Sequence, residues 1–362
     1  MRFPEFSGEW EKHTIGELCE EFKSGKNIKA ENIQEGGVYP VFGGNGLRGY
    51  ADRYNHEGDY VLIGRQGALC GNVRFVTGKT YITEHAIAAK ATNNNYTHFL
   101  EYLFVRLNLG QFSDQSAQPG LAVNKLLKIE TFVPSKEEQY KIASLLKFLD
   151  ERIATQNKVI EDLKKLKSAI AERVYNCRTY QLYRIGDVIE QVSKRNTRMS
   201  IDKVLSVSNK LGFINQSEQF EDRIVASEDT SNYKIVYKDD FAYNPARINV
   251  GSIARLKHFN KGIVSPMYIC FRVKQGIVLD YLEYFFTTNY FFYEMQKRLE
   301  GSVRQCLSFE GLCNIPIYIP NLDEQQKIGR KVSVIMEKID NENRYLDSLK
   351  MQKQYLLRQM FI

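Results

Sequence analysis

The sequence has no long apolar run and no sign of a secretory signal. Its 362 residues contain no stretch near the roughly 18 consecutive apolar residues of a membrane-spanning helix. The opening Met1-Arg2-Phe3-Pro4 is not followed by the apolar core of a signal peptide. With 43% hydrophobic and 26% charged residues, the composition is that of an ordinary globular protein with room for two domains. We therefore expect the chain to act in the cytoplasm, with no membrane partner.

The residues that build disulfides, metal sites and catalytic centres are few and scattered. The six cysteines include no C-x-x-C pair, and the five histidines include no pair at metal-ligand spacing. The glycine-flanked segment 64–67 lacks the Gly-Lys-Ser/Thr of a phosphate-binding loop. Carboxylate pairs such as Asp239-Asp240 have no histidine or metal cluster to work with. We expect no metal and no cofactor bound by this chain, and no catalysis by the chain alone.

One short segment has the pattern of a cofactor-binding turn. Residues 42–46 read Phe-Gly-Gly-Asn-Gly, which matches the F-x-G-x-G turn that binds S-adenosylmethionine in DNA methyltransferases. The residues after it do not open a helix, and the nearest relative of the N/D-P-P-Y/F motif, at 243–246, lacks the second proline and the final aromatic residue. Glycines in this pattern are also typical of a β-hairpin turn. We predict the hairpin, and a stand-alone adenine methyltransferase is the alternative.

Basic residues outnumber acidic ones. Fifty Lys and Arg against 43 Asp and Glu give a formal charge of +7 and a pI near 8.9. Such a balance favours polyanionic partners without deciding which one. Nucleic acid is one interpretation, and a protein-binding scaffold with incidental charge is another.

The strongest pattern is a long heptad helix that occurs twice. Residues 137–174 and 323–360 carry apolar residues in steps of four and three, with two polar interruptions each, as in the seam of a coiled coil. The offset is constant, because 328 − 142 = 186, and Pro134 recurs as Pro320 at the same offset. The first seam is Ile142, Leu146, Leu149, Ile153, Ile160, Leu163, Ile170 and Val174, interrupted at Gln156 and Lys167; the second is Ile328, Val332, Ile335, Ile339, Leu346, Leu349, Leu356 and Met360, interrupted at Glu342 and Lys353. Shared interruptions predict that one unit is present twice.

Each long helix follows a segment rich in short strands. The runs 38–42, 60–63, 72–76 and 86–89 are separated by Gly, Asn and Asp, and 96–109 has helical spacing. The second half repeats this order: Ile185-Gly186-Asp187-Val188 echoes Ile15-Gly16-Glu17-Leu18, and a helix is expected near 281–289. We predict an α+β fold in which two similar β-rich domains with short helices, 1–134 and 179–320, are joined by two long helices, 135–178 and 321–362.

The two long helices are expected to form an antiparallel coiled coil, because two copies related by a two-fold axis place them in opposite directions. Facing residues then have numbers with a constant sum. The sum 509 sets Gln156 against Lys353 and Lys167 against Glu342, whereas a shift by one heptad sets charged against apolar residues, which desolvation disfavours. We predict the 509 register, with an overlap of about 26 residues or roughly 39 Å. The alternative is two helices that pack separately, each on its own domain.

Loops in both domains carry side chains of the kinds that read nucleic acid. Arg can hold guanine, Asn and Gln can hold adenine, and Lys commonly contacts phosphate, although solvated loops use the same residues. The candidate DNA-binding residues are Lys23, Lys26, Asn27, Asn45, Arg48, Arg65, Gln66 and Gln118 in the first domain, and Lys194, Arg195, Asn196, Arg198, Asn209, Lys210, Arg247, Asn249, Arg304 and Gln305 in the second.

Together with the repeat, several segments resemble the specificity subunit of type I restriction-modification systems. They are residues 8–18, 39–46, 134–139 with the first long helix, and 320–328 with the second, so the likeness covers nearly the whole chain. The resemblance implies two target-recognition domains joined by two spacer helices, which read a split site in double-stranded DNA. It also implies two methyltransferase subunits, which bind S-adenosylmethionine and methylate adenine, and restriction subunits as partners. It assigns no base contact to a residue, because the recognition domains are the variable part.

Overall fold

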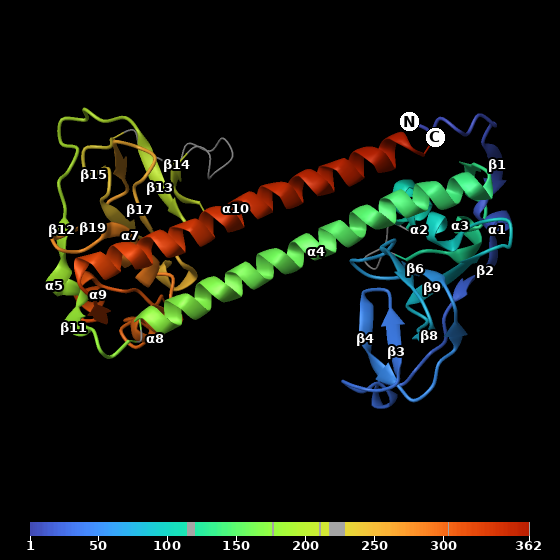
Figure 1. The fold of residues 1–362 in the computed structure, drawn as a ribbon, viewed down its shortest axis with the longest axis horizontal. Coiled ribbons are helices and arrows are strands. Elements are labelled where there is room, and N and C mark those ends of the chain that lie inside the picture. The colour runs from blue at the N-terminus through green and yellow to red at the C-terminus, as the bar shows by residue number, and fades with distance from the viewer. Residues whose placement is uncertain (114–119, 176, 210, 217–228, 303, 362) are drawn as a thin grey trace. The chain divides into compact units, whose positions relative to one another are not determined.

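The computed structural model covers residues 1–113, 120–175, 177–209, 211–216, 229–302 and 304–361. The chain forms two compact units: unit 1 consists of Met1–Asn157 and Arg344–Ile362, and unit 2 consists of Lys158–Asn343. Two long helices, α4 (Lys136–Tyr175) and α10 (Leu322–Gln359), each contribute one part to each unit (Figure 1). Each unit is therefore one β-rich domain together with a segment of both helices.

Unit 1 is built on strands that form three small sheets within its described residues. Its other elements, in chain order, are β1 (Glu11–Thr14), α1 (Ile15–Leu18), β2 (Cys19–Ser24), η1 (Ala30–Asn32), β3 (Tyr39–Gly43), β4 (Gly46–Ala51), β5 (His56–Glu57), β6 (Tyr60–Gly64), β7 (Val73–Val76), β8 (Lys79–Ile82), β9 (Ala86–Ala91), α2 (Thr97–Leu107), η2 (Leu109–Phe112), α3 (Val123–Leu126) and β10 (Glu130–Val133). The sheet orders are β2-β9-β6-β7, β4-β3-β8-β5 and β1-β10.

Unit 2 repeats this architecture strand for strand. Its other described elements are β11 (Gln181–Arg184), α5 (Ile185–Val188), β12 (Ile189–Val192), β13 (Val204–Ser208), β14 (Gly212–Asn215), β15 (Lys234–Tyr237), β16 (Phe241–Tyr243), η3 (Ile248–Val250), β17 (Ile253–Arg255), β18 (Lys261–Val264), β19 (Ile269–Val273), α7 (Leu279–Phe285), α8 (Asn289–Gln296), α9 (Phe309–Cys313) and β20 (Pro316–Ile319). The sheet orders are β12-β19-β16-β17, β14-β13-β18-β15 and β11-β20. Each sheet has its counterpart in unit 1, so the predicted duplication is confirmed.

Most predicted elements lie where the sequence places them. The strand-like runs of the first domain become β3, β6, β7 and β9, and both long helices begin and end within three residues of their predicted bounds. The helix expected near residue 281 is divided into α7 and α8, because Thr288 caps the second helix by accepting a hydrogen bond from the Phe291 N–H at 3.0 Å. The Phe-Gly-Gly-Asn-Gly segment is a hairpin, in which Gly43 pairs with Gly46 and Gly46 has φ +106°. A strand therefore follows this turn, where a cofactor-binding turn would open a helix.

A buried glutamine explains why the same residues open both long helices. The Gln139 side chain donates to the Pro134 carbonyl at 3.0 Å and accepts from the Tyr96 N–H at 3.0 Å, just before α2. Gln325 does the same in unit 2, where it donates to Pro320 at 2.9 Å and accepts from the Val278 N–H at 2.8 Å, just before α7. The two side chains are 1% and 2% exposed. Each therefore satisfies backbone groups that burial would otherwise leave without a partner.

Both long helices contribute to the hydrophobic cores of the domains. In unit 1, Ile142 and Leu146 of α4 share one core cluster with Leu357 of α10 and with Phe99 of α2. In unit 2, Val332 of α10 belongs to the corresponding cluster, with α4 and α7. Each long helix therefore packs both on the other helix and on a domain, so the predicted arrangement and its alternative occur together. Within the described residues, no helix is long and apolar enough to span a membrane.

The helix segments run antiparallel within unit 1. Along α4, Asp150 forms an ion pair with Lys353, and Arg152, further along, contacts the ring and hydroxyl of Tyr345, earlier in α10. Partner numbers thus fall as α4 numbers rise. In unit 2, Lys167 of α4 has Asp340 of α10 among the charges that act on it. The predicted antiparallel arrangement is confirmed in unit 1.

Within unit 1, the predicted 509 register is wrong by about one heptad. In that register Arg152 would face residue 357, which lies twelve residues from Tyr345, or about 18 Å along the helix and beyond side-chain reach. The Asp150–Lys353 ion pair has the sum 503 and fits the sum 502, since 509 − 7 = 502. The prediction failed because two of the three charged seam residues find partners beside the seam, while burial lowers the pKa of the third, Lys167. Lys353 pairs with Asp150 on the facing helix, and Glu342 pairs with Lys338 one turn earlier on α10, so desolvation does not reject this register.

Candidate nucleic-acid interface

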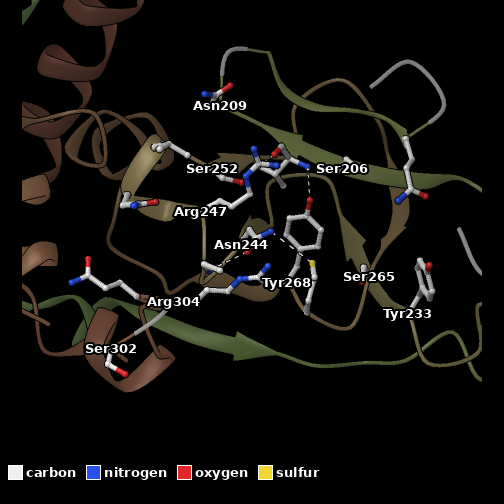
Figure 2. A pocket seen from close by; sticks show the side chains of 17 residues that line it. Ser206, Asn209, Tyr233, Asn244, Arg247, Ser252, Ser265, Tyr268, Ser302 and Arg304 are labelled. Carbon is white, nitrogen blue, oxygen red and sulfur yellow. Dashed lines mark hydrogen bonds between the residues drawn. The ribbon is translucent and has the colours of Figure 1, made fainter. Parts of the chain in front are cut away.

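Unit 2 has an open pocket of about 920 Å³ at the ends of its strands. Five of the predicted DNA-binding residues line it: Asn209, Arg247, Asn249, Arg304 and Gln305. Figure 2 shows Asn209, Arg247 and Arg304 around one opening, on three separate segments of the chain. The other lining residues are Ser206, Val207, Gln216, Tyr233, Asn244, Ala246, Val250, Ser252, Ser265, Met267, Tyr268 and Ser302. The first and last of these five predicted residues are 96 positions apart in the sequence, since 305 − 209 = 96, and the fold brings them to one pocket.

The floor of the pocket is held by hydrogen bonds between strands and loops. Ser252, which is 4% exposed, donates through its hydroxyl to the Val207 carbonyl at 3.1 Å. The Val207 N–H donates to the Tyr268 hydroxyl at 3.3 Å. Lys234 donates to the Tyr268 carbonyl at 2.6 Å. These bonds tie β13, β15 and the loop before β19 together, so the exposed side chains above them stand on a fixed base.

The chemistry of the pocket suits a polyanion with hydrogen-bonding edges. Arg247 and Arg304 are exposed, and no Asp or Glu is among its described lining residues. Met267 and Val250 add exposed apolar surface at 60% and 53% of their maximum. Guanidinium, amide and apolar groups within one pocket can address phosphate, purine edges and the thymine methyl group.

The predicted residues between β12 and β13 lie beside this pocket. Asn196 is 1% exposed, and its side-chain amide donates to the Ile201 carbonyl at 2.9 Å. Its backbone N–H donates to the carbonyl of Tyr233, which lines the pocket. Arg195 reaches the Asn232 side chain at 3.1 Å, while Lys194 and Arg198 are exposed. We therefore omit Asn196 from the candidate interface and retain the three basic residues as predictions.

Unit 1 brings its candidate loops together through backbone hydrogen bonds. The Lys26 N–H donates to the Ile82 carbonyl at 3.0 Å, and the Arg65 N–H donates to the His85 carbonyl at 2.9 Å. The Thr83 N–H donates to the Phe42 carbonyl at 2.9 Å. The loops that carry Lys26, Asn27, Asn45, Arg48, Arg65 and Gln66 therefore meet around the turn between β8 and β9. Lys23 lies nearby on β2, and the set remains a prediction for the first half of the interface.

The glycines of the β3–β4 hairpin allow these loops to pack closely. A Cβ on Gly44 would lie 2.7 Å from the His85 carbonyl oxygen, and a Cβ on Gly43 would lie 2.9 Å from the Cδ of Arg48. A Cβ on Gly46 would lie 3.0 Å from the guanidinium of Arg74. Arg74 was not predicted as a site residue, because the sequence of residues 72–76 indicates only a strand. Its exposed side chain adds a further cation beside Asn45 and Arg48.

A partly buried hydrogen-bond network lies beside Lys23. Glu21 binds the His56 ring at 3.0 Å and accepts from the Tyr60 hydroxyl at 3.1 Å. Burial lowers the pKa of His56 despite this carboxylate, and burial together with Glu21 raises the pKa of Tyr60 to about 12. The Lys23 ammonium lies 3.3 Å from Glu21. Lys23 therefore has a carboxylate partner, and its charge is less available to phosphate than that of Lys26.

Two predicted residues, Gln118 and Lys210, lie outside the described residues. Among the described residues, no group of three His, Cys, Asp or Glu could hold a metal ion. Three further lining residues, Met267, Val250 and Tyr268, were not predicted from the sequence. Their signal was weak, because isolated apolar residues in loops are common in proteins of every kind.

The family model for the type I restriction modification DNA specificity domain matches the chain twice, over residues 7–165 and 178–351. The chain belongs to this family. The two matches correspond to the two copies seen in the sheets, so the family's specificity domain and the internal repeat describe the same duplication.

Relatives in the specificity-domain family match the chain to different extents. The specificity subunit of the type I restriction enzyme EcoprrI from Escherichia coli is 39% identical over 180 residues, which are 49% of this chain and 44% of that protein. The chain thus aligns with less than half the length of this relative. The MjaVIII specificity subunit from Methanocaldococcus jannaschii is 24% identical over 99% of this chain and 92% of that protein. The crystal structure of the type I S subunit from M. genitalium shares the fold, with a TM-score of 0.70 at 18% identity over 100% and 99% of the two chains.

Proposed function

We propose that this chain is the DNA specificity subunit of a type I restriction-modification complex. The duplicated specificity domain gives it two readers, and each unit would contact one half of a split DNA site. The observation that carries the proposal is the pocket of unit 2, where five residues chosen for their base-reading chemistry line one opening without a described acidic residue. The relatives named as specificity subunits support the same function.

The pocket suggests a division of roles among its side chains. Arg247 and Arg304 would each hold a guanine or a phosphate, and Asn209, Asn249 and Gln305 would offer amides to adenine. Met267 and Val250 would contact thymine methyl groups. In unit 1, Arg48, Arg65 and Arg74 with Asn45 and Gln66 would read the other half-site.

The reaction itself belongs to the partners in this proposal. Two methyltransferase subunits would bind S-adenosylmethionine and methylate adenine, and restriction subunits would complete the assembly. This chain would hold no cofactor and catalyse nothing alone, in keeping with the hairpin at residues 42–46. As a chain that binds DNA, it would act in the cytoplasm.

Methylation mapping tests the assignment of half-sites. The chain would be purified with its methyltransferase subunits, and methylated adenines in DNA would be sequenced for the unaltered chain and for Arg247→Ala and Arg304→Ala. We expect each substitution to relax one half-site by about 1–3 kcal/mol per lost base contact, or to weaken all sites equally if the residue holds phosphate. A change in both half-sites from a unit 2 variant would contradict the division of labour.

Two further measurements separate the alternative functions. Methyl transfer by the purified chain alone would support the stand-alone methyltransferase. DNA binding that does not weaken between about 50 and 200 mM salt would support the protein scaffold, since each neutralised phosphate contributes a slope of about −0.9 in log K against log salt.

The two long helices would set the number of unread base pairs between the half-sites. Inserting about four residues, one helical turn, into both α4 and α10 should lengthen the unread spacer and leave the half-sites unchanged. An unchanged spacer in the methylation map would exclude this role of the helices.

A further inference from the structure

The N-terminal arm of unit 1, residues 1–6, is held by the start of α4. Arg2 forms two hydrogen bonds with the Glu138 carboxylate, at 2.8 and 2.6 Å, and this carboxylate is 1% exposed. Lys141 lies over the rings of Phe3 and Phe6, with 5.8 Å to each centroid. One carboxylate and one ammonium of α4, a turn apart, therefore bind an arginine and two aromatic rings.

Unit 2 repeats the residues that hold the arm. Glu138 and Lys141 recur as Glu324 and Lys327, since 138 + 186 = 324 and 141 + 186 = 327. The local backbone is also the same: the Glu138 N–H donates to the Ser135 hydroxyl at 3.4 Å, and the Glu324 N–H donates to the Asn321 side chain at 2.9 Å. The carboxylate of Glu324 thus leaves the helix at the same position as that of Glu138.

Unit 2 has no arm of its own in this position among the described residues. In unit 2, α4 remains helical to Tyr175 and β11 begins at Gln181, whereas in unit 1 residues 1–6, which precede β1, lie against the start of α4. A pocket of about 690 Å³ opens here, lined by Glu324 and by Tyr180, Asn321 and Gln325 among others. In unit 2 the place that corresponds to the one covered by Arg2 borders this pocket, where Glu324 lies near the Tyr180 phenol and, after burial, helps to raise the pKa of Tyr180.

The other charged groups of this pocket already have partners. Lys274 donates to the carbonyls of Gly186 and Asp187 at 3.2 and 3.1 Å, and the Asp187 carboxylate accepts the Arg184 N–H at 2.8 Å. Among the described residues, the Glu324 carboxylate accepts no hydrogen bond. Its counterpart in unit 1, the Glu138 carboxylate, binds the Arg2 guanidinium through two hydrogen bonds.

We propose that this pocket of unit 2 binds an arginine, followed by an aromatic residue, in an extended segment of a partner protein. The guanidinium would pair with Glu324 as Arg2 pairs with Glu138, and the aromatic ring would lie over Lys327 as Phe3 lies over Lys141. The arm of unit 1 shows the chemistry of the ligand. The proposal goes beyond DNA reading, because it assigns a protein-docking site that no base contact requires.

The test uses the full chain and a peptide with the sequence of residues 1–7, Met-Arg-Phe-Pro-Glu-Phe-Ser, labelled at its C-terminus. Fluorescence anisotropy should show saturable binding, and Glu324→Gln should weaken it about tenfold, as expected for the loss of a charged hydrogen-bond pair. A peptide with citrulline in place of arginine, which keeps the shape and removes the charge, should lose affinity to the same extent. Asp323→Asn is the matched control, since it removes a carboxylate from the same turn of α10 and should leave binding unchanged.

Three results would overturn the proposal. The first is no binding to the unaltered chain. The second is binding that Glu138→Gln abolishes and Glu324→Gln does not, which would mean that the peptide only replaces the arm of unit 1. The third is self-association of the chain that Glu324→Gln abolishes, which would assign the pocket to the arm of a second copy. DNA binding in these variants should be unchanged, so failure here leaves the proposed function standing.

Discussion

The two copies treat the same seam lysine differently, and this difference can be tested by substitution. In unit 1, Lys353 pairs with Asp150 and lies 5.4 Å from the centre of the Tyr102 ring, whose hydroxyl donates to Asp150 at 2.9 Å. The counterparts in unit 2 are Lys167 and Met336, since 353 − 186 = 167 and 150 + 186 = 336. Burial lowers the pKa of Lys167, and Asp340 opposes this only in part. Met336→Asp should therefore give Lys167 the partner that Lys353 has.

The size of the effect follows from the exposure of the pair in unit 1. Lys353 and Asp150 are 24% and 38% exposed, so their ion pair lies between a surface pair, worth about 0.2–1 kcal/mol, and a buried hydrogen bond to a charge, worth about 1.5–3 kcal/mol. We expect a coupling free energy of about 1–1.5 kcal/mol between Lys167 and the carboxylate that Met336→Asp introduces. The loss of Met336 packing opposes it by a similar amount, because this side chain is half-buried. The single variant should thus be close to neutral.

A double-mutant cycle with Lys167→Met, Met336→Asp and both together isolates the coupling. Unfolding free energies from urea titration supply the four corners, and Lys167→Met alone should stabilise the chain. The pH dependence gives a second readout. Because the folded pKa of Lys167 lies below its unfolded value near 10.5, stability should rise as pH increases between the two values, and Lys167→Met should remove this rise. A coupling below about 0.3 kcal/mol, within the error of additivity, or destabilisation by Lys167→Met, would refute the reasoning.

Three further predictions concern the scaffold and the pocket. Gln139→Ala and Gln325→Ala should each destabilise the chain by about 2–4 kcal/mol, because each leaves a buried N–H and a carbonyl without partners. Since the two glutamines make the same contacts, urea titration should give equal losses of unfolding free energy. A loss below about 1 kcal/mol would contradict the prediction. Gly44→Ala should destabilise the chain by about 1–3 kcal/mol, because its Cβ would lie 2.7 Å from the His85 carbonyl oxygen. Gly58→Ala is the control for backbone strain alone, since Gly58 has φ +108° and open space at the position of a Cβ. Met267→Ala should reduce the preference for thymine over uracil about fourfold at one position of one half-site, because burying one methyl group contributes roughly 0.8 kcal/mol. Competition binding measures this preference, and an unchanged value would exclude a contact with the thymine methyl group.

The architecture could be predicted because the sequence contains the same unit twice. Shared interruptions at Gln156 and Glu342, together with Pro134 and Pro320, identified both helices without knowledge of the sheets. The register failed because a heptad pattern records which positions face inward, while the choice among equivalent sums depends on where long side chains find partners. Lys353 pairs with Asp150, which lies outside the seam and which the heptad pattern does not include.

The candidate interface was predictable in kind and unpredictable in detail. Arg247 and Arg304 were identified from their chemistry, but only the fold shows that their loops meet at one pocket. Asn196 has the same chemistry and is buried, because its amide closes a local turn by binding Ile201. Arg74 is placed at the hairpin by the pairing of β6 with β7, a contact between strands that no local pattern reports.

The contact between the edge strand and the first domain helix shows why the repeat is visible in some segments and not in others. In unit 1, Phe75 of β7 packs against His98 of α2, with ring centroids 3.6 Å apart. In unit 2 the equivalent strand residue is Arg255, because Phe75 pairs with Val61 as Arg255 pairs with Phe241, and it forms ion pairs with Asp280 and Glu283 of α7. An aromatic contact and an ion pair thus join the same two elements. Because the neighbouring strands already fix the positions of strand and helix, an aromatic contact or an ion pair can join them, and the sequences of the two copies differ here. Gln139 and Gln325 each donate to one backbone carbonyl and accept from one backbone N–H. Because this position needs a side chain that is both donor and acceptor at that length, both copies keep glutamine.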